Sequence, residues 1–130
     1  MDSLTDSLVT ATATTETSFA LDHYSTIVQQ VLQDLVDLCN QATDRSTDTF
    51  LVSDPINSHY IWMTLGWQNS QRVCGITVYI RLHQNKVWIE EDCTEDGIAL
   101  NLIAAGIPQQ DIVLGFHSPQ LRPYTAFAAT

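Results

Sequence analysis

The sequence predicts an α+β domain: an antiparallel meander sheet of four strands, or five if a late apolar run joins it, with two helices packed on one face. Three observations lead to this fold class. Apolar residues recur at three- and four-residue steps across residues 22–42, as they do in an amphipathic helix. Four apolar or alternating runs follow between residues 50 and 90, and their connections are too short for parallel neighbours. A shorter helical pattern comes next, between Thr94 and Gly106.

The first helix is predicted to begin with Asp22 as its N-cap, because an aspartate side chain can accept a hydrogen bond from the first free backbone N–H groups. Its apolar stripe is broad, as expected for a helix that lies on a sheet. The stripe consists of Tyr24, Ile27, Val28, Val31, Leu32, Leu35, Leu38, Cys39 and Ala42.

The strands are separated by turn residues. Residues 50–52 form the first run, and a turn containing Asp54 and Pro55 leads to a second strand over residues 59–67. The third strand has the clearest alternation, and Gln84-Asn85 joins it to a returning strand over residues 87–90. The apolar face of the third strand is predicted to carry Cys74, Ile76, Val78, Ile80 and Leu82.

The second helix is predicted to start at Thr94 as N-cap, with Glu95 and Asp96 in the first turn, where the helix dipole favours carboxylates. Gly106 is predicted to end it. The apolar run of residues 112–114 is interpreted as a fifth strand or a buried loop.

Length and composition indicate one domain, residues 19–130, preceded by an extension over residues 1–18 that is disordered or loosely attached. We expect a cytoplasmic protein, since no signal peptide or membrane-spanning run is present. The net charge is −10 with only five cations, so tight nucleic-acid binding by this chain alone is not expected. The cations are Arg45, Arg72, Arg81, Lys86 and Arg122.

The three cysteines form no CxxC pair. Cys39 and Cys74 fall on apolar faces and are predicted to be buried. Cys93 lies among carboxylates, which oppose thiolate formation, so a nucleophilic role is not expected. No glycine-rich phosphate loop or preset metal spacing is present, and no cofactor or metal is expected.

The order and spacing of several short motifs resemble the XisI-like family, which is described in cyanobacteria as controlling factors for excision of the fdxN element. The resemblance spans about residues 21–128 and rests on Asp54 with His59-Tyr60, Gly66-Trp67, Arg72 with Gly75, Lys86-Val87-Trp88-Ile89, Thr94-Glu95, Gly106-Ile107-Pro108, the run from Asp111 to His117, Pro119 and Arg122. The sequence departs from the family in its N-terminal extension, in the turn between Asp54 and His59, and in having Gln84-Asn85 where Asp-Gly is common. The resemblance implies an accessory role beside a companion protein, XisH, in an excision that a separate recombinase carries out.

The polar residues that match the family have both structural and chemical interpretations. Structurally, Asp54 would order a turn, Glu95 would serve the first turn of a helix, and Asp111 would pair with an arginine or cap a turn. His59 and His117 are predicted to be hydrogen-bonded structural histidines. The chemical alternative is a metal-assisted nuclease subunit that uses Asp54, Glu95 and Asp111 with a histidine.

The leading hypothesis is a non-catalytic accessory protein that acts through protein–protein contact with an XisH-like companion, a recombinase or a second copy of itself. Exposed Trp, Tyr and Arg side chains often anchor interfaces, and part of the aromatic set is interpreted as such a patch rather than as a base-stacking platform. A further alternative is an acidic mimic of DNA that uses Glu90, Glu91 and Asp92, or a general interaction module unrelated to excision. The contacts chosen for test are Arg72, Tyr79, Arg81, Trp88 and Arg122.

Overall fold

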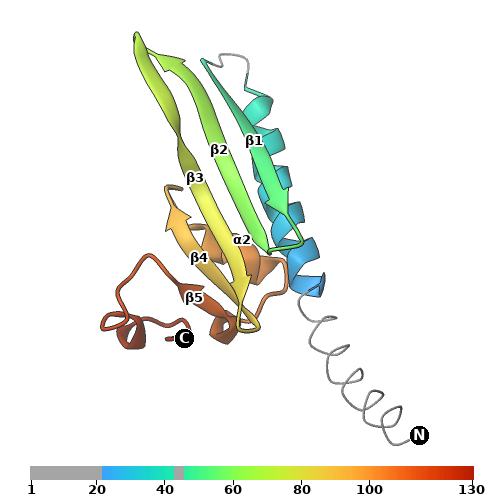
Figure 1. Ribbon diagram of the computed structural model, residues 1–130, viewed down its shortest axis with the longest axis vertical. Coiled ribbons are helices and arrows are strands. Elements are labelled where there is room, and N and C mark those ends of the chain that lie inside the picture. The colour runs from blue at the N-terminus through green and yellow to red at the C-terminus, as the bar shows by residue number, and fades with distance from the viewer. Residues whose placement is uncertain (1–21, 43–45) are drawn as a thin grey trace, which may run out of the picture.

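A computed structural model describes residues 22–42 and 46–130, and confirms the predicted α+β class (Figure 1). Five strands form one sheet in the order β1-β2-β3-β4-β5, and the helix of residues 22–40 and the shorter helix α2 both lie behind it. The expected extension over residues 1–18 lies outside the described residues. The labelled elements are β1 (Thr47–Asp54), β2 (His59–Gln68), β3 (Gln71–His83), β4 (Lys86–Asp92), α2 (Ile98–Ala104), η1 (Gln109–Asp111), β5 (Ile112–Leu114) and η2 (Arg122–Tyr124).

The first four strands form the predicted antiparallel meander, and β5 joins as a fifth strand parallel to β4. A parallel neighbour requires a crossover connection, and α2 supplies it between β4 and β5. The tight connection between β3 and β4 is also confirmed. Gln84 and Asn85 both have positive φ, 54° and 63°, which is the backbone geometry that matches the twist of a two-residue hairpin.

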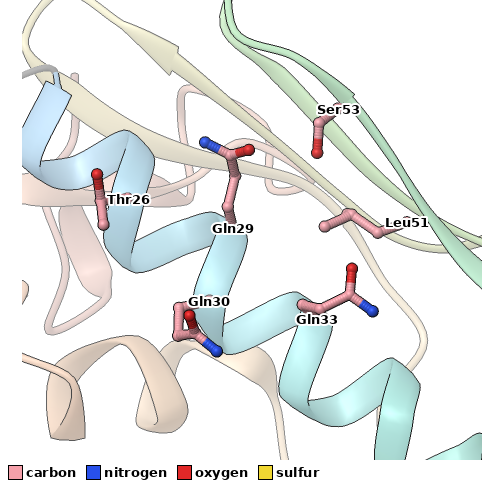
Figure 2. Close-up of a pocket in the computed structure, with 6 residues that line it drawn as sticks. All are labelled: Thr26, Gln29, Gln30, Gln33, Leu51 and Ser53. Atoms are coloured by element: carbon pink, nitrogen blue, oxygen red, sulfur yellow. The ribbon is translucent and has the colours of Figure 1, made fainter.

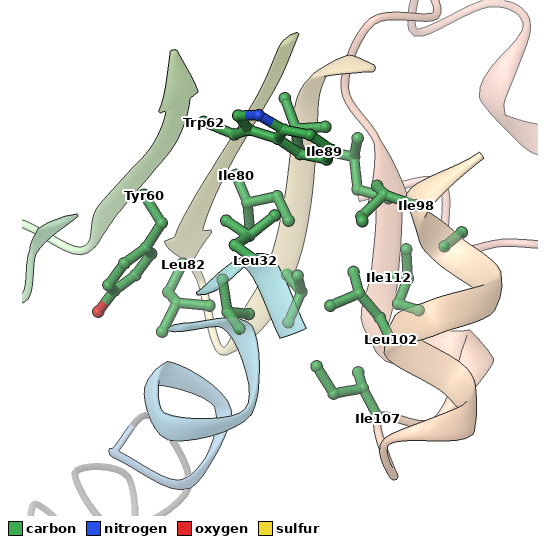
Figure 3. Packing of buried hydrophobic residues seen from close by; sticks show 14 of the residues in the cluster. Leu32, Tyr60, Trp62, Ile80, Leu82, Ile89, Ile98, Leu102, Ile107 and Ile112 are labelled. Atoms are coloured by element: carbon green, nitrogen blue, oxygen red, sulfur yellow. The ribbon is translucent and has the colours of Figure 1, made fainter. Parts of the chain in front are cut away.

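The hydrophobic core fills the space between the sheet and the two helices (Figure 3). Val28, Leu32 and Val36 enter it from the first helix at four-residue steps, so they share one helix face. The strands and the C-terminal half contribute the other buried residues, among them Tyr60, Trp62, Ile80, Ile89, Ile98, Leu102, Ile107 and Ile112. No helix in the described ranges is both long enough and apolar enough to cross a membrane.

The first helix differs from expectation at both ends. Asp22 is itself helical, which corrects its predicted role as N-cap. At the other end Leu38 and Cys39 are exposed, which contradicts the predicted burial of Cys39. The next position four residues after Val36 is Asn40, and its Nδ2 donates to the carbonyl of Thr49 at 3.0 Å. A polar contact with β1 therefore replaces apolar packing in the last turn.

A β-bulge changes which side chains of β3 face the helices. The register between β2 and β3 shifts after Trp62, which pairs with Val78, while Met63 pairs with Ile76. Thr77 is the extra residue, and its hydroxyl contacts that of Thr64 at 2.7 Å. Strand alternation then turns Ile76 and Cys74 away from the helices. Both are exposed, so their predicted burial is wrong.

Helix α2 begins three residues later than a Thr94 N-cap requires. Its N-cap is Gly97, and Thr94, Glu95 and Asp96 all precede it, which corrects the predicted cap and first turn. Its end is as predicted. The backbone N–H of Gly106 donates to Ile103 and that of Ile107 donates to Leu102, both at 3.0 Å, while Gly106 has φ of 113°. This pair of bonds is the Schellman arrangement that favours glycine.

Candidate protein-interaction face

Trp88 of β4 contacts two arginines on the face of the sheet that the helices leave open. Arg81 is its cross-strand partner on β3, with the guanidinium carbon 5.5 Å from the ring centroid. Arg122 comes from η2, and its guanidinium carbon lies 5.1 Å from the same ring. Both distances suit a cation–π contact. Three of the five contacts chosen from the sequence therefore meet at one place.

Arg122 also attaches the C-terminal segment to the sheet. Its Nε donates to the carbonyl of His117 at 3.0 Å, and Nη2 donates to that of Gly115 at 3.4 Å. Because a planar guanidinium can donate along its edge while its face covers a ring, one side chain fulfils both roles. Arg122 is thus a structural residue as well as a surface cation.

The indole of Trp88 is itself buried, with 7% of its surface exposed. Its Nε1 donates to the carbonyl of His83 at 3.0 Å. With so little of its surface exposed, the ring offers no free face on which a nucleobase could stack. A partner approaching this face would meet the arginines, with Trp88 as the support that holds them.

Tyr79 and His59 extend this cluster along the open face. The Tyr79 hydroxyl and His59 Nδ1 are 2.7 Å apart, and His59 is the cross-strand partner of Arg81. The hydrogen bond predicted for His59 is therefore present. Tyr79 is the fourth of the five chosen contacts that lies in this region.

Arg72 is the contact that does not join the others. It lies at the start of β3, nine residues before Arg81, which corresponds to about 30 Å along an extended strand. Its guanidinium carbon lies 5.4 Å from the ring of Trp67, its cross-strand partner, which is 57% exposed. The open face thus has an arginine–tryptophan contact near each end.

An apolar strip lies between these two ends, and the sequence alone does not reveal it. Cross-strand pairing places Phe50, Met63 and Ile76 in one row, and Val52 with Ile61 in the next. We call these five residues the open-face strip. Phe50, Val52 and Ile76 are 39–45% exposed, although β-strands of this kind usually place polar residues on a solvent-facing side. The alternation of β3 would reveal it only if the bulge were known.

The electrostatics of the open face are simple. Arg81 Nε and Glu90 Oε1, 3.3 Å apart, form the only salt bridge found among the described residues. Both side chains are about one-third exposed, so the pair contributes little to folding stability. Of the acidic run proposed to mimic DNA, Glu90 is therefore paired, and Asp92 hydrogen-bonds to backbone N–H groups of residues 94 and 98. These three carboxylates do not form one free acidic row.

The carboxylates considered for a metal site are separated by the fold. Asp54 orders its turn as predicted, because Oδ1 accepts the backbone N–H of Asn57 at 3.1 Å. The Asn57 side-chain amide also bonds to Asp54 and holds the pKa of that carboxyl below its usual value. Glu95 precedes α2 and is exposed.

Among the described residues, Asp111 pairs with no arginine and caps no turn, contrary to the two roles that the sequence suggested. It accepts a hydrogen bond from the hydroxyl of Tyr24 and so joins η1 to the first helix. His117 offers its backbone carbonyl to Arg122, and its ring lies against Phe116. Within residues 22–42 and 46–130, no group of three or more His, Cys, Asp or Glu side chains is placed to hold a metal ion.

Cys93 is exposed. Partial desolvation raises the pKa of its thiol, and the carboxylates of Glu91 and Asp92 raise it further. A raised pKa leaves less thiolate at neutral pH, so the thiol is a poor nucleophile, in agreement with the sequence prediction.

A shallow polar hollow of about 370 Å³ lies between the first helix and β1 (Figure 2). It is lined by Thr26, Gln29, Gln30, Gln33, Leu51 and Ser53. None of these side chains titrates in the range needed for acid–base catalysis. The hollow offers hydrogen bonds only, whereas the open face offers apolar area with flanking arginines and aromatics, as protein interfaces do.

Comparison with known proteins identifies close structural relatives of this arrangement. A crystal structure of the fdxN element excision controlling factor XisI from Anabaena variabilis is 38% identical in sequence, with a TM-score of 0.73. A XisI-like protein from the same species is 28% identical, with a TM-score of 0.76. Each comparison covers 85% of this chain and 99% of the other. The curated proteins contain no match.

The family comparison covers almost the same region. The family described as XisI protein matches residues 20–129, which include every strand and helix of the described structure. The resemblance inferred from short motifs is thus confirmed by the match over the whole domain and by the shared fold. The chain belongs to the XisI family.

Proposed function

We propose that this protein is a non-catalytic accessory factor that controls the programmed excision of a DNA element. Its family membership and its 38% identity to a protein described as an fdxN element excision controlling factor support this role. We further propose that it acts by contact with an XisH-like companion protein, while a separate recombinase performs the strand chemistry. Direct contact with DNA is not part of the proposal, because the net charge is −10.

The observation that carries the proposal is the open-face strip with its flanking arginines. A contiguous apolar surface costs free energy in water unless another molecule covers it. Ile76 and Phe50 are 39% exposed near the middle of the strip, and Arg81 and Arg122 lie beyond one end. An apolar centre beside arginines supported by an aromatic ring matches the usual composition of a protein interface.

The experiment is a binding titration between the purified chain and the XisH-like protein of the same cell. Ile76→Lys places a charge in the centre of the strip on an exposed position, so the fold should tolerate it. We expect affinity to fall by at least about tenfold, since interface centres commonly lose more than 1.4 kcal/mol per anchor. Gln110→Lys adds the same charge on an exposed residue outside the sheet and is the matched control.

Sedimentation of the chain alone distinguishes the companion from a second copy. If the strip is a self-association surface, the unmodified chain sediments as a dimer and Ile76→Lys as a monomer. The proposed companion contact requires instead that Ile76→Lys weakens the mixed complex while Gln110→Lys does not. Equal affinity of the two variants for the XisH-like protein would refute the role assigned to this face.

A further inference from the structure

Two apolar depressions lie on either side of the loop that leads into α2, away from the open-face strip. One, of about 330 Å³, is formed mainly by Ala99, Leu100, Leu114, Phe116 and Phe127. The other, of about 490 Å³, lies between the end of the first helix and the start of α2, beside Leu35, Leu38 and Trp62. Asp96 and Gly97 belong to both. The loop is therefore a narrow ridge between two hollows.

Apolar side chains at the margins of both hollows are exposed to solvent. Leu100 is 62% exposed and Phe116 is 45% exposed beside the first hollow, and Leu38 is 63% exposed beside the second. Single exposed apolar residues are ordinary, but three gathered around adjoining hollows suit insertion of a partner's side chains.

The ridge and the strand before it carry a concentrated negative charge. Glu90, Glu91, Asp92, Glu95 and Asp96 lie within seven consecutive residues. Glu90 is neutralised in part by Arg81, and Asp92 accepts the backbone N–H groups of Thr94 and Ile98. Glu91, Glu95 and Asp96 take part in none of the salt bridges found in the described part of the chain.

We infer that this ridge and its two hollows bind a positively charged segment of a partner protein, which inserts apolar side chains into the hollows and sets lysines or arginines against Glu95 and Asp96. The apolar hollows provide affinity through burial, and the carboxylates select for cations. This inference does not depend on the proposed function, because it concerns a different surface.

The negative charge of the ridge argues against nucleic acids, anionic membranes and a second copy of this chain as its partner. Nucleic acids and anionic membrane surfaces carry the same sign as the ridge and would be repelled. A second copy of this chain has a net charge of −10 and only five cations, of which Arg81, Arg72 and Arg122 are committed to contacts on the sheet or its C-terminal segment. A basic segment of a different protein is the occupant that fits.

The probe is a short fluorescently labelled peptide in which leucines alternate with pairs of lysines, titrated into the purified full chain by fluorescence anisotropy. A second peptide has serine in place of each leucine. The variants are Glu95→Gln with Asp96→Asn, which removes two charges from the ridge, and Leu100→Ser, which removes an exposed apolar margin. Asp34→Asn with Asp48→Asn removes two exposed charges elsewhere, and Leu121→Ser removes an apolar side chain that is 54% exposed elsewhere.

We expect Leu100→Ser to weaken binding of the leucine peptide by about fivefold, as for an interface residue worth 1 kcal/mol. The ridge double variant should weaken it by about two- to fivefold, since each exposed ion pair is worth less than 1 kcal/mol. Added salt should weaken binding further. Both control variants should bind as the unmodified chain does, and the serine peptide should bind more weakly.

Absence of binding, equal binding of the two peptides, or equal losses in the ridge variant and its charge-matched control would each overturn the inference. The last result would mean that net charge alone attracts the peptide. Nuclear magnetic resonance of the unmodified chain gives a test without mutation: peptide-induced shifts should concentrate at residues 35–39, 94–101 and 114–116, which line the two hollows. Shifts spread over all acidic positions would equally refute it.

Discussion

Oδ2 of Asp92 accepts a hydrogen bond from the backbone N–H of Ile98 at 2.8 Å. Its other oxygen accepts the N–H of Thr94 at 2.9 Å. The last residue of β4 thus caps the helix that begins six residues later, and Gly97, the formal N-cap, offers no side chain. A carboxylate near a helix start also interacts favourably with the helix dipole. One side chain therefore connects the sheet to the crossover that places β5.

Asp92→Ala should destabilise the domain by about 1–2 kcal/mol, the usual cost of removing a helix cap. The backbone N–H groups of Thr94 and Ile98 would then have to hydrogen-bond to water. Asp96→Ala is the control, because Asp96 is exposed and precedes the helix; its effect should stay within about 0.5 kcal/mol. Urea unfolding checks this through the transition midpoint at unchanged slope. Identical midpoints for the two variants would rule out the capping role of Asp92.

Gly66 and Gly75 should respond in opposite ways to alanine. A Cβ on Gly66 would lie 2.6 Å from the carbonyl oxygen of Ser46 and 2.7 Å from the Cα of Thr47, both backbone atoms that cannot move independently. We expect Gly66→Ala to cost about 1–3 kcal/mol, as overpacking does. A Cβ on Gly75 meets nothing within 4 Å, so Gly75→Ala should be neutral or slightly stabilising. Thermal unfolding of the two variants side by side would reveal the contrast, and similar midpoints would contradict it.

Arg122→Ala should release the C-terminal segment and expose the ring of Trp88. Loss of the hydrogen bonds to the carbonyls of His117 and Gly115 should destabilise the fold by about 1–2 kcal/mol. Arg122→Lys should not restore stability, because an ammonium group cannot reach two carbonyls while it covers the ring.

Acrylamide quenching in a Trp67→Phe background reports a change at Trp88, because Trp62 and Trp88 are both 7% exposed and Arg122 lies over the Trp88 ring. Quenching should increase in both Arg122 variants. Arg72→Ala is the control, because the hydrogen bond from its guanidinium to the Gly66 carbonyl is 3.5 Å long and exposed. Unchanged quenching in Arg122→Ala would show that this arginine does not shield Trp88.

The contact between Tyr24 and Asp111 predicts a specific alkaline response. Desolvation, the hydrogen bond to Asp111 and its negative charge raise the pKa of Tyr24 from 10.0 to about 12. Because the folded state holds this proton more tightly, its contribution to stability is complete below pH 10.0 and is lost as the pH rises to about 12.

Tyr24→Phe should therefore lose less stability than the unmodified chain across that interval, as measured by urea unfolding at several pH values. Tyrosinate absorbance should also lose one late-titrating group. Tyr124→Phe removes a tyrosine at an 89% exposed position and is the matched control. If Tyr24→Phe and the unmodified chain show the same pH dependence, the contact does not stabilise the folded state.

Local patterns in the sequence identified most of the secondary structure. The alternation of residues 78–82, the short connection at Gln84-Asn85 and the stop at Gly106 each depend on neighbours within a few residues. These signals arise from backbone geometry and hydrogen bonding between near neighbours in the chain, so they can be recognised in the sequence without knowledge of the fold. Residues 112–114 were identified as a strand or a buried loop because a short apolar run suits either.

The candidate interaction face was predicted in part. Arg81, Trp88 and Arg122 were chosen because such side chains are frequent at interfaces, and the fold brings them together. Arg72 was chosen for the same reason and lies at the other end of β3. Residue type indicates what a side chain can do, but its neighbours depend on strand register.

The sequence by itself determined that this chain forms a helix, a four-stranded meander, a second helix and a late apolar run, because each follows from periodicity, turn residues and connection length. Only the tertiary structure decided that Thr77 bulges and turns Ile76 to the open face, that Asp92 rather than Thr94 caps α2, and that β5 pairs parallel to β4. The bulge also exposes Cys74, and the polar contact of Asn40 with β1 replaces apolar packing in the last helical turn, where Cys39 is exposed. Whether a side chain is buried depends on which other helix or strand packs over it. The local sequence pattern does not show how far that packing extends.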